Sequence, residues 1–258
     1  MSPPRERQAA PSHPDEFYVN YLLVPSSLAA LLRILVAILL TFIAGLAGVW
    51  SESRRNAGGG TWDDAQIQTF SGQIIAIPYA MLLPDAPDAR PLLIVEAGKH
   101  GGGQRALPLL GKSVSIRGTR LHRDGREMLE LDPSPDAITA APATVSPAAT
   151  AAPRSLGRIA LRGEIVDSKC YLGAMKPGDG KTHKACASLC VRGGIPPMLV
   201  STLPDGTLRF TLLADEHGEP ISDQILPLVA DPVEVQGDLV SIGGVECLRV
   251  RVSDIRRL

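Results

Sequence analysis

The chain has 258 residues, a length that accommodates two small domains and a membrane anchor. Its formal net charge of −1 gives no electrostatic reason to expect nucleic acid as a partner, and its aromatic content of 4% is low for a surface that stacks bases. Gly and Pro together contribute 47 residues, which favours short strands and turns over a helical bundle.

A long apolar segment near the N-terminus is the first predicted element. A polar tail, residues 1–27, precedes an apolar run at 28–50, whose 23 residues include one charge, Arg33. A helix of this length reaches about 34 Å, enough for a hydrocarbon core of about 30 Å. The run exceeds the roughly 7–15 apolar residues of a signal peptide, and its leader is long and polar. We therefore predict an uncleaved transmembrane anchor.

The charges on either side of this run set its expected orientation. Arg5, Arg7 and Arg33 lie on its amino-terminal side, and Arg54 and Arg55 on the other. Lys and Arg accumulate on the cytoplasmic side of membrane spans, so this distribution favours a cytoplasmic N-terminus. We expect a single-pass membrane protein whose C-terminal domains face the periplasm or the cell exterior.

Two β-rich modules are expected after the anchor. The segment 107–131 aligns without gaps on 226–250 at a constant offset of 119, matching for example Gly118 with Gly237. Both segments alternate apolar and polar residues, as half-buried antiparallel strands do. The pattern predicts an internal repeat of two small OB-like barrels, with a four- or five-stranded meander as the alternative. The expected divisions are a spacer at 51–66, a first module at 67–132, a linker at 133–156 and a second module at 157–258.

The expected linker is rich in Pro and Ala. Residues 133–153 contain five Pro and eight Ala. A segment of this composition has too few large apolar side chains to form a core, so it should be an extended spacer. We expect each module to have a hydrophobic core of its own.

The second module contains an insertion that carries most of the chemical information in the chain. Gly163 to Gly218 is 26 residues longer than the corresponding stretch of the first module. The insertion holds Cys170, Met175, His183, Cys186 and Cys190, whereas the first module has no cysteine. His183, Cys186 and Cys190 have the spacing i, i+3 and i+7, which places them on one face of a helix.

The local sequence predicts where that helix begins and ends. Thr182 is the expected N-cap and Gly193 the expected stop, and Cys170 follows the end of a strand. The face with His183 would then meet Cys170.

Three interpretations of this cluster remain open. In the first, Cys170, His183, Cys186 and Cys190 form a Cys3His metal site of the kind that binds zinc, and Met175 as an additional ligand would also suit Cu(I). In the second, Cys170 forms a disulfide with Cys186 or Cys190, with Cys247 expected to point outward and away. In the third, the cysteines are small buried apolar residues beside a solvated His.

A redox-active thiol is a further alternative. Four of the six lysines of the chain crowd this segment, and positive charge lowers the pKa of neighbouring thiols. These lysines are Lys169, Lys176, Lys181 and Lys184. A solvated, lysine-rich loop is the simpler interpretation of the same residues.

The motif GEIVDSKCY followed by HKACASLCVRGG, in residues 160–255, resembles an essentially uncharacterised family of small bacterial secreted or membrane-anchored domains. The resemblance lies in the spacing of the Cys, His and GG residues. It implies an OB-like fold and an envelope location, with no established activity. Together with the apolar run, it leads us to expect a single-pass protein of the bacterial inner membrane whose C-terminal domains are periplasmic. The KPGDGK loop is long compared with the family pattern.

Together these features predict a membrane-anchored accessory or binding protein rather than an enzyme. It would serve a membrane redox or metal-handling assembly through a zinc or copper site and a protein partner in the envelope. The sequence shows no Ser/His/Asp set, no paired carboxylates and no GxSxG motif. A thiol-based redox enzyme and a purely structural module with a disulfide-linked insertion are the alternatives.

Overall fold

A computed structural model describes residues 26–55, 59–86, 89–142, 153–221 and 223–258. The chain forms two compact units, residues 1–57 and 58–258, which are described separately.

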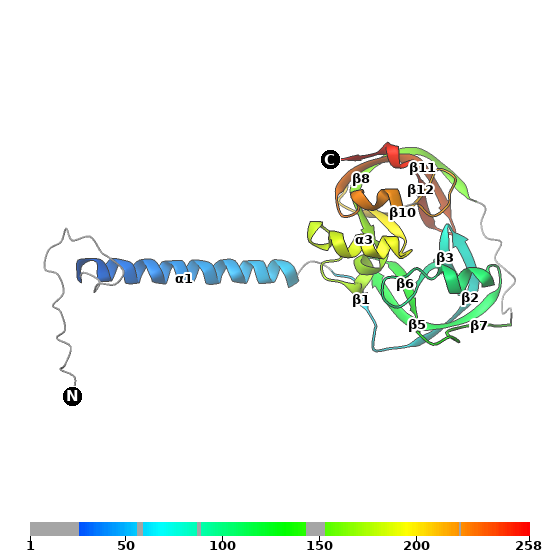
Figure 1. Ribbon diagram of the computed structural model, residues 1–258, viewed down its shortest axis with the longest axis horizontal. Coiled ribbons are helices and arrows are strands. Elements are labelled where there is room, and N and C mark those ends of the chain that lie inside the picture. Colours follow the sequence, from blue (N-terminus) through cyan, green and yellow to red (C-terminus); the bar gives the residue numbers. More distant parts are fainter. Residues whose placement is uncertain (1–25, 56–58, 87–88, 143–152, 222) are drawn as a thin grey trace, which may run out of the picture. The chain divides into compact units, whose positions relative to one another are not determined.

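The first unit contains one long helix, α1 (Ser26–Arg55), drawn in blue in Figure 1. Its stretch Ser27–Ser51 is long and apolar enough to cross a membrane, a property that a membrane anchor shares with a signal sequence. Most of the predicted tail 1–27 lies outside the described residues, including Arg5 and Arg7, on which the expected orientation depends. The apolar helix is thus confirmed, and its topology stays a prediction.

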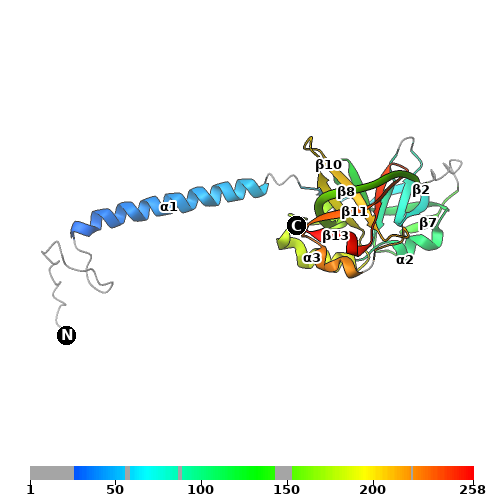
Figure 2. The same cartoon turned by 90° about the horizontal axis from the view of Figure 1, so that it is seen from above.

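The second unit is mostly β and contains two closed barrels (Figures 1 and 2). The strands of the first barrel close in the order β5-β2-β3-β4-β6-β5, with all pairs antiparallel except β4 with β6. Their bounds are β2 (Gln68–Ile77), β3 (Tyr79–Pro84), β4 (Leu92–Val95), β5 (Ser113–Arg123) and β6 (Arg126–Leu131). Two short strands, β1 (Thr61–Trp62) and β7 (Ile138–Ala140), pair with β5.

The second barrel has the same connectivity. It closes in the order β11-β8-β9-β10-β12-β11, again with one parallel pair, β10 with β12. Its strands are β8 (Arg154–Asp167), β9 (Pro197–Thr202), β10 (Leu208–Ala214), β11 (Pro232–Ile242) and β12 (Val245–Arg249), and β13 (Ile255–Arg257) pairs with β11. The fold is that of two OB-like barrels, as predicted. Although β5 and β11 start and finish at positions that the sequence alignment matched, an internal repeat remains an interpretation of that alignment.

Short helical segments connect the strands in both barrels. In the first barrel α2 (Gly103–Ala106) and a 3₁₀ turn (Leu107–Leu109) lie between β4 and β5, and in the second a 3₁₀ segment (Asp223–Leu228) lies between β10 and β11. The second barrel has additional segments between β8 and β9. These are a π-helical turn, η2 (Cys170–Ala174), a 3₁₀ turn, η3 (Lys181–His183), and the helix α3 (Lys184–Arg192).

The two barrels share a hydrophobic core, contrary to the expectation of separate ones. On β4, Leu92 and Ile94 belong to the interior of the first barrel, while the alternate residues Leu93 and Val95 belong to a cluster that includes residues of both barrels. From the second barrel that shared cluster contains Met198, Phe210 and Leu212, among others. Successive side chains of a strand point to opposite faces, so these strands are buried on both.

The shared core corrects the prediction for Cys247. Its side chain does point to the face of β12 opposite Leu248, but it is 2% exposed and belongs to the shared cluster. The face expected to meet solvent is therefore covered by apolar residues of both barrels.

The first barrel also uses parts of both expected connecting segments. Strand β1 falls within the spacer 51–66, and β7 falls within the Pro/Ala linker, where Ala137 is fully buried. Strand β8 begins at Arg154, still within the expected linker. Residues 143–152 of that linker lie outside the described residues.

Candidate metal centre

The helix α3 forms as the sequence indicates, with one difference at its start. It covers Lys184–Arg192 and its C-cap is Gly193, as predicted. The residue at its N-cap position is His183, without a side-chain capping bond, and Thr182 lies in the preceding 3₁₀ turn. The predicted capping role of Thr182 is therefore wrong.

One face of α3 fixes the helix to the second barrel. Ala187 and Val191 pack into the interior cluster of that barrel, while Cys190 belongs to the shared cluster, with Cys186 packed against it. Lys184 Nζ reaches Asp231 Oδ2 at 2.7 Å. The apolar spacing thus turns the cysteines toward the junction between the barrels.

Four of the five predicted site residues gather at this junction. The ligand atoms of Cys170, His183 and Cys186 lie within 4.8 Å of one another, and those of Asp167, Cys170 and Cys190 form a second group within the same limit. Cys170 is common to both groups, and its Sγ lies 4.0 Å from that of Cys190. For comparison, two sulfurs on one tetrahedral zinc ion are about 3.8 Å apart, given Zn–S bonds of about 2.3 Å.

Met175 is placed differently from the other four. Its side chain is 46% exposed, whereas Cys170, His183 and Cys190 are buried. The structure therefore gives no support for Met175 as a ligand in this conformation.

Asp167, which sequence reasoning missed, holds two of these residues in place. Its side chain is fully buried at the end of β8. Oδ1 accepts a hydrogen bond from the Cys170 N–H at 2.8 Å, the bond that a capping carboxylate makes with the third residue of a helical turn. Oδ2 lies 3.0 Å from His183 Nε2. With Nε2 donating to this carboxylate, Nδ1 of His183 is the nitrogen left to bind a metal.

Lys99, from the loop after β4 of the first barrel, was also missed. Its Nζ donates to Cys186 Sγ at 2.8 Å and lies 3.6 Å from Cys190 Sγ. The bond to Cys186 raises the pKa of Lys99, so its ammonium group stays charged. The positive charge at the thiols thus comes from outside the lysine-rich insertion.

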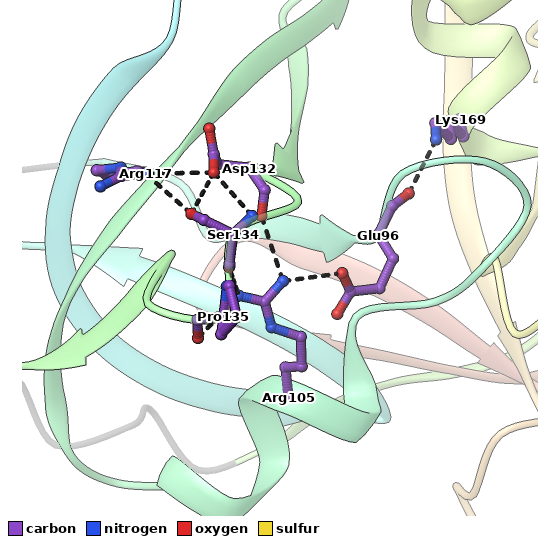
Figure 3. A network of polar contacts seen from close by, with 7 residues as sticks. All are labelled: Glu96, Arg105, Arg117, Asp132, Ser134, Pro135 and Lys169. Atoms are coloured by element: carbon purple, nitrogen blue, oxygen red, sulfur yellow. Dashed lines mark hydrogen bonds and ion pairs between the residues drawn. The ribbon is translucent and has the colours of Figure 1, made fainter.

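Lys169, one of the four lysines of the insertion, forms its bonds across the junction between the two barrels instead. It is buried and forms an ion pair with Glu130 Oε2 at 2.5 Å. It also donates to the carbonyl oxygens of Glu96 and Gly98, at 2.9 and 2.7 Å. Figure 3 shows its bond to Glu96, whose carboxylate binds Arg105 on α2.

Glycines allow the Lys99 loop to lie against the end of α3. The N–H of Gly101 donates to the carbonyl of Gly193 at 3.0 Å. A Cβ on Gly193 would lie 1.8 Å from the Lys99 carbonyl oxygen, and one on Gly101 would lie 2.1 Å from that of Gly194. Gly193 and Gly194 therefore end the helix, and their lack of a Cβ allows the Lys99 loop of the first barrel to pack against it.

The two buried thiols have unequal proton affinities. A hydrogen bond from Cys170, supported by the charge of Lys99, lowers the pKa of Cys190 to about 7, although burial and the charge of Asp167 act in the opposite direction. The same bond, with burial, raises the pKa of Cys170. Near neutral pH the pair therefore favours a protonated Cys170 that donates to a Cys190 thiolate.

All four cysteines are free thiols in the structure. The sulfurs of Cys170 and Cys190 are 4.0 Å apart, about twice the length of a disulfide bond. Both metal binding and disulfide formation are thus geometrically accessible, the second after a movement of about 2 Å.

Comparison with known proteins identifies no relative. No family model matches the chain, and neither a curated protein nor a solved structure matches it. The resemblance of residues 160–255 to a family of bacterial envelope domains therefore stays a prediction.

Proposed function

We propose that this chain is a membrane-anchored protein whose second barrel binds one soft metal ion, Zn²⁺ or Cu⁺. Cys170, His183 and Cys186 would bind it, with Cys190 as the fourth ligand. One observation supports this proposal above the others: a buried carboxylate, Asp167, orients both His183 and Cys170. Metal-binding histidines almost always donate their second N–H to such a partner.

The electrostatics of the pocket agree with a bound ion. Three thiolates and a neutral imidazole around a divalent ion carry a net charge of −1. The ammonium group of Lys99, at 2.8 Å from Cys186 Sγ, is placed to neutralise that charge. In the absence of metal the same group bonds to the sulfurs of Cys186 and Cys190.

We further propose that α1 anchors the protein in the bacterial inner membrane with the barrels in the periplasm. There it would act as an accessory subunit of a redox or metal-handling assembly. The apolar length of α1 supports the anchor. The metal site shared with a first-barrel loop supports a binding role for the two barrels together.

The metal proposal is tested on the full chain purified in mild detergent. We expect one equivalent of zinc or copper by elemental analysis, and three thiols that react with a disulfide reagent only after a chelator is added. The fourth thiol, Cys247, lies outside the site, and burial raises its pKa to about 12, so it should react only on unfolding. A protein that takes up no metal from a reduced, metal-supplemented buffer would refute the site.

Thiol redox chemistry is the second candidate function. Its support is the separation of 4.0 Å between Cys170 and Cys190, together with the lowered pKa of Cys190. In that case a metal-free protein would show one fast-reacting thiol, and oxidation would join Cys170 to Cys190. Peptide mass spectrometry after mild oxidation distinguishes the two functions.

A further inference from the structure

A second site lies at the junction of the barrels, in an apolar cavity of about 380 Å³. Its walls include Leu93 from the first barrel, Met198 and Phe210 from the second, and Leu172 from η2. All four side chains are buried. Binding sites for small molecules are commonly apolar hollows of this size between domains.

The rim of this cavity carries two arginines. Arg90 precedes β4, and Arg126 begins β6. The guanidinium of Arg126 lies 5.4 Å from the centre of the Phe210 ring, so its charge adjoins the apolar wall. Burial, and then the charge of Arg90, lower the pKa of Arg126, while the charge of Glu246 acts in the opposite direction.

The acidic groups at the rim are already engaged. Glu246 accepts two hydrogen bonds from Arg209, at 2.8 and 2.9 Å, and Glu127 pairs with Arg120 at 3.4 Å. Within the described residues, Arg90 and Arg126 form no ion pair. Two neighbouring positive charges beside an apolar hollow are complementary to a molecule with an acidic head and an apolar tail.

We propose that this cavity binds an alkyl chain bearing one anionic head group, with the chain against Leu93, Met198 and Phe210 and the head group at Arg90 and Arg126. A free fatty acid and an anionic membrane lipid share this chemistry. The site uses none of the proposed metal ligands, so it does not depend on the metal.

The test uses the full chain in phosphatidylcholine nanodiscs, with empty discs measured in parallel to subtract partitioning. Calorimetric titration compares decanoate, decyl phosphate, decanol and decyltrimethylammonium. We expect decanoate and decyl phosphate to bind one to one, decanol to bind at least about tenfold more weakly, and the cation not to bind. Equal affinities for decanoate and decanol, or no binding by any anion, would overturn the proposal.

Two variants test the two parts of the site. Arg126→Gln should weaken decanoate binding by about tenfold and leave decanol unchanged, since it removes charge and little volume. Val245→Phe, at the partly exposed rim, should weaken both because it fills the cavity. Arg162→Gln removes an exposed arginine that pairs with Glu234 and should alter neither affinity. Unchanged decanoate affinity in both cavity variants would refute the location.

The natural source is distinguished by the disc lipid. If a two-tailed anionic lipid occupies the cavity, discs containing phosphatidylglycerol should block decanoate binding. If the ligand is a free fatty acid, the affinity for decanoate should be the same in both disc types.

Discussion

Asp167 has no solvent contact, and both of its oxygens are used to position proposed ligands. We expect Asp167→Asn to lower metal affinity by about 10–100-fold, because the amide binds His183 and the Cys170 N–H more weakly than the carboxylate does. Competition with a chromophoric chelator measures the affinity. Asp205→Asn, in an exposed turn of the second barrel, is the control and should leave it unchanged.

Lys99 tests whether the first barrel takes part in the site. Lys99→Met removes the cation beside a complex of net charge −1, so we expect metal to bind about tenfold more weakly. Lys99→Arg should restore part of the affinity, whereas Lys112→Met, at another first-barrel lysine, should have no effect. Tighter binding by Lys99→Met would mean that the ammonium group competes with the metal instead of stabilising its complex.

The pH dependence of metal affinity follows from the two thiol pKa values. The pKa of Cys190 is lowered to about 7, so below pH 7 metal must displace a proton from this thiol, and above pH 7 it need not. The raised pKa of Cys170 means that its proton must be displaced on both sides of pH 7. Affinity should therefore rise with pH throughout, and the slope of log affinity against pH should fall by about one near pH 7. A slope that is constant from pH 6 to pH 8 would contradict the assignment.

Among the elements, α3 ends directly against the Lys99 loop of the first barrel. Gly193 has an ordinary helical φ of −77°, so alanine is tolerated by its backbone, but the added Cβ would meet the Lys99 carbonyl at 1.8 Å. We expect Gly193→Ala to lower the free energy of unfolding by about 1–3 kcal/mol through overpacking and to weaken metal binding as Lys99 is displaced. Urea unfolding and chelator competition measure the two effects.

Gly103→Ala is the matched control for this substitution. Gly103 is also a glycine with negative φ, at the start of α2, and its added Cβ would meet only the flexible Leu107 side chain at 3.4 Å. We expect the free energy of unfolding of the Gly103→Ala protein to change little. Equal destabilisation by the two substitutions would show that the contact with the Lys99 loop is unimportant.

How much of α3 and its surroundings the sequence could predict depends on how far apart in the chain the interacting residues lie. The spacing of His183, Cys186 and Cys190 and the GG pair predicted α3 and its end, because helix periodicity and capping depend on neighbouring residues. Lys99 is 87 residues from Cys186, and no local pattern connects the two. Asp167 was more accessible to sequence reasoning, since an acidic residue three positions before Cys170 fits a helix cap.

At the scale of the whole molecule, the order of apolar and polar residues along the strands indicated the shared core. Half-buried strands alternate apolar and polar residues, as Ser113–Arg123 largely does. Leu92–Val95 is apolar throughout, which indicates burial on both faces, and all four residues are buried. The sequence therefore predicted both barrels, whereas recognising their junction required attention to the strands that do not alternate.

The shared core predicts that the two barrels unfold together. Leu93 is 7% exposed and lies on the face of β4 that joins the shared cluster. Leu93→Ala should lower the free energy of unfolding by about 2–5 kcal/mol through loss of buried surface and the cavity left behind. Because both barrels contribute to this cluster, the loss of stability should appear in both barrels.

Amide hydrogen exchange followed by mass spectrometry separates the barrels, using peptides from β5 for the first and β11 for the second. In Leu93→Ala both peptides should lose protection by the same free energy, as one cooperative unit does. Ile116→Val changes the interior of the first barrel and, if the barrels unfold as one unit, should lower protection in both peptides as well. If Leu93→Ala accelerates exchange in β5 alone while β11 keeps its protection, the barrels are independent and the apolar face between them contributes little to stability.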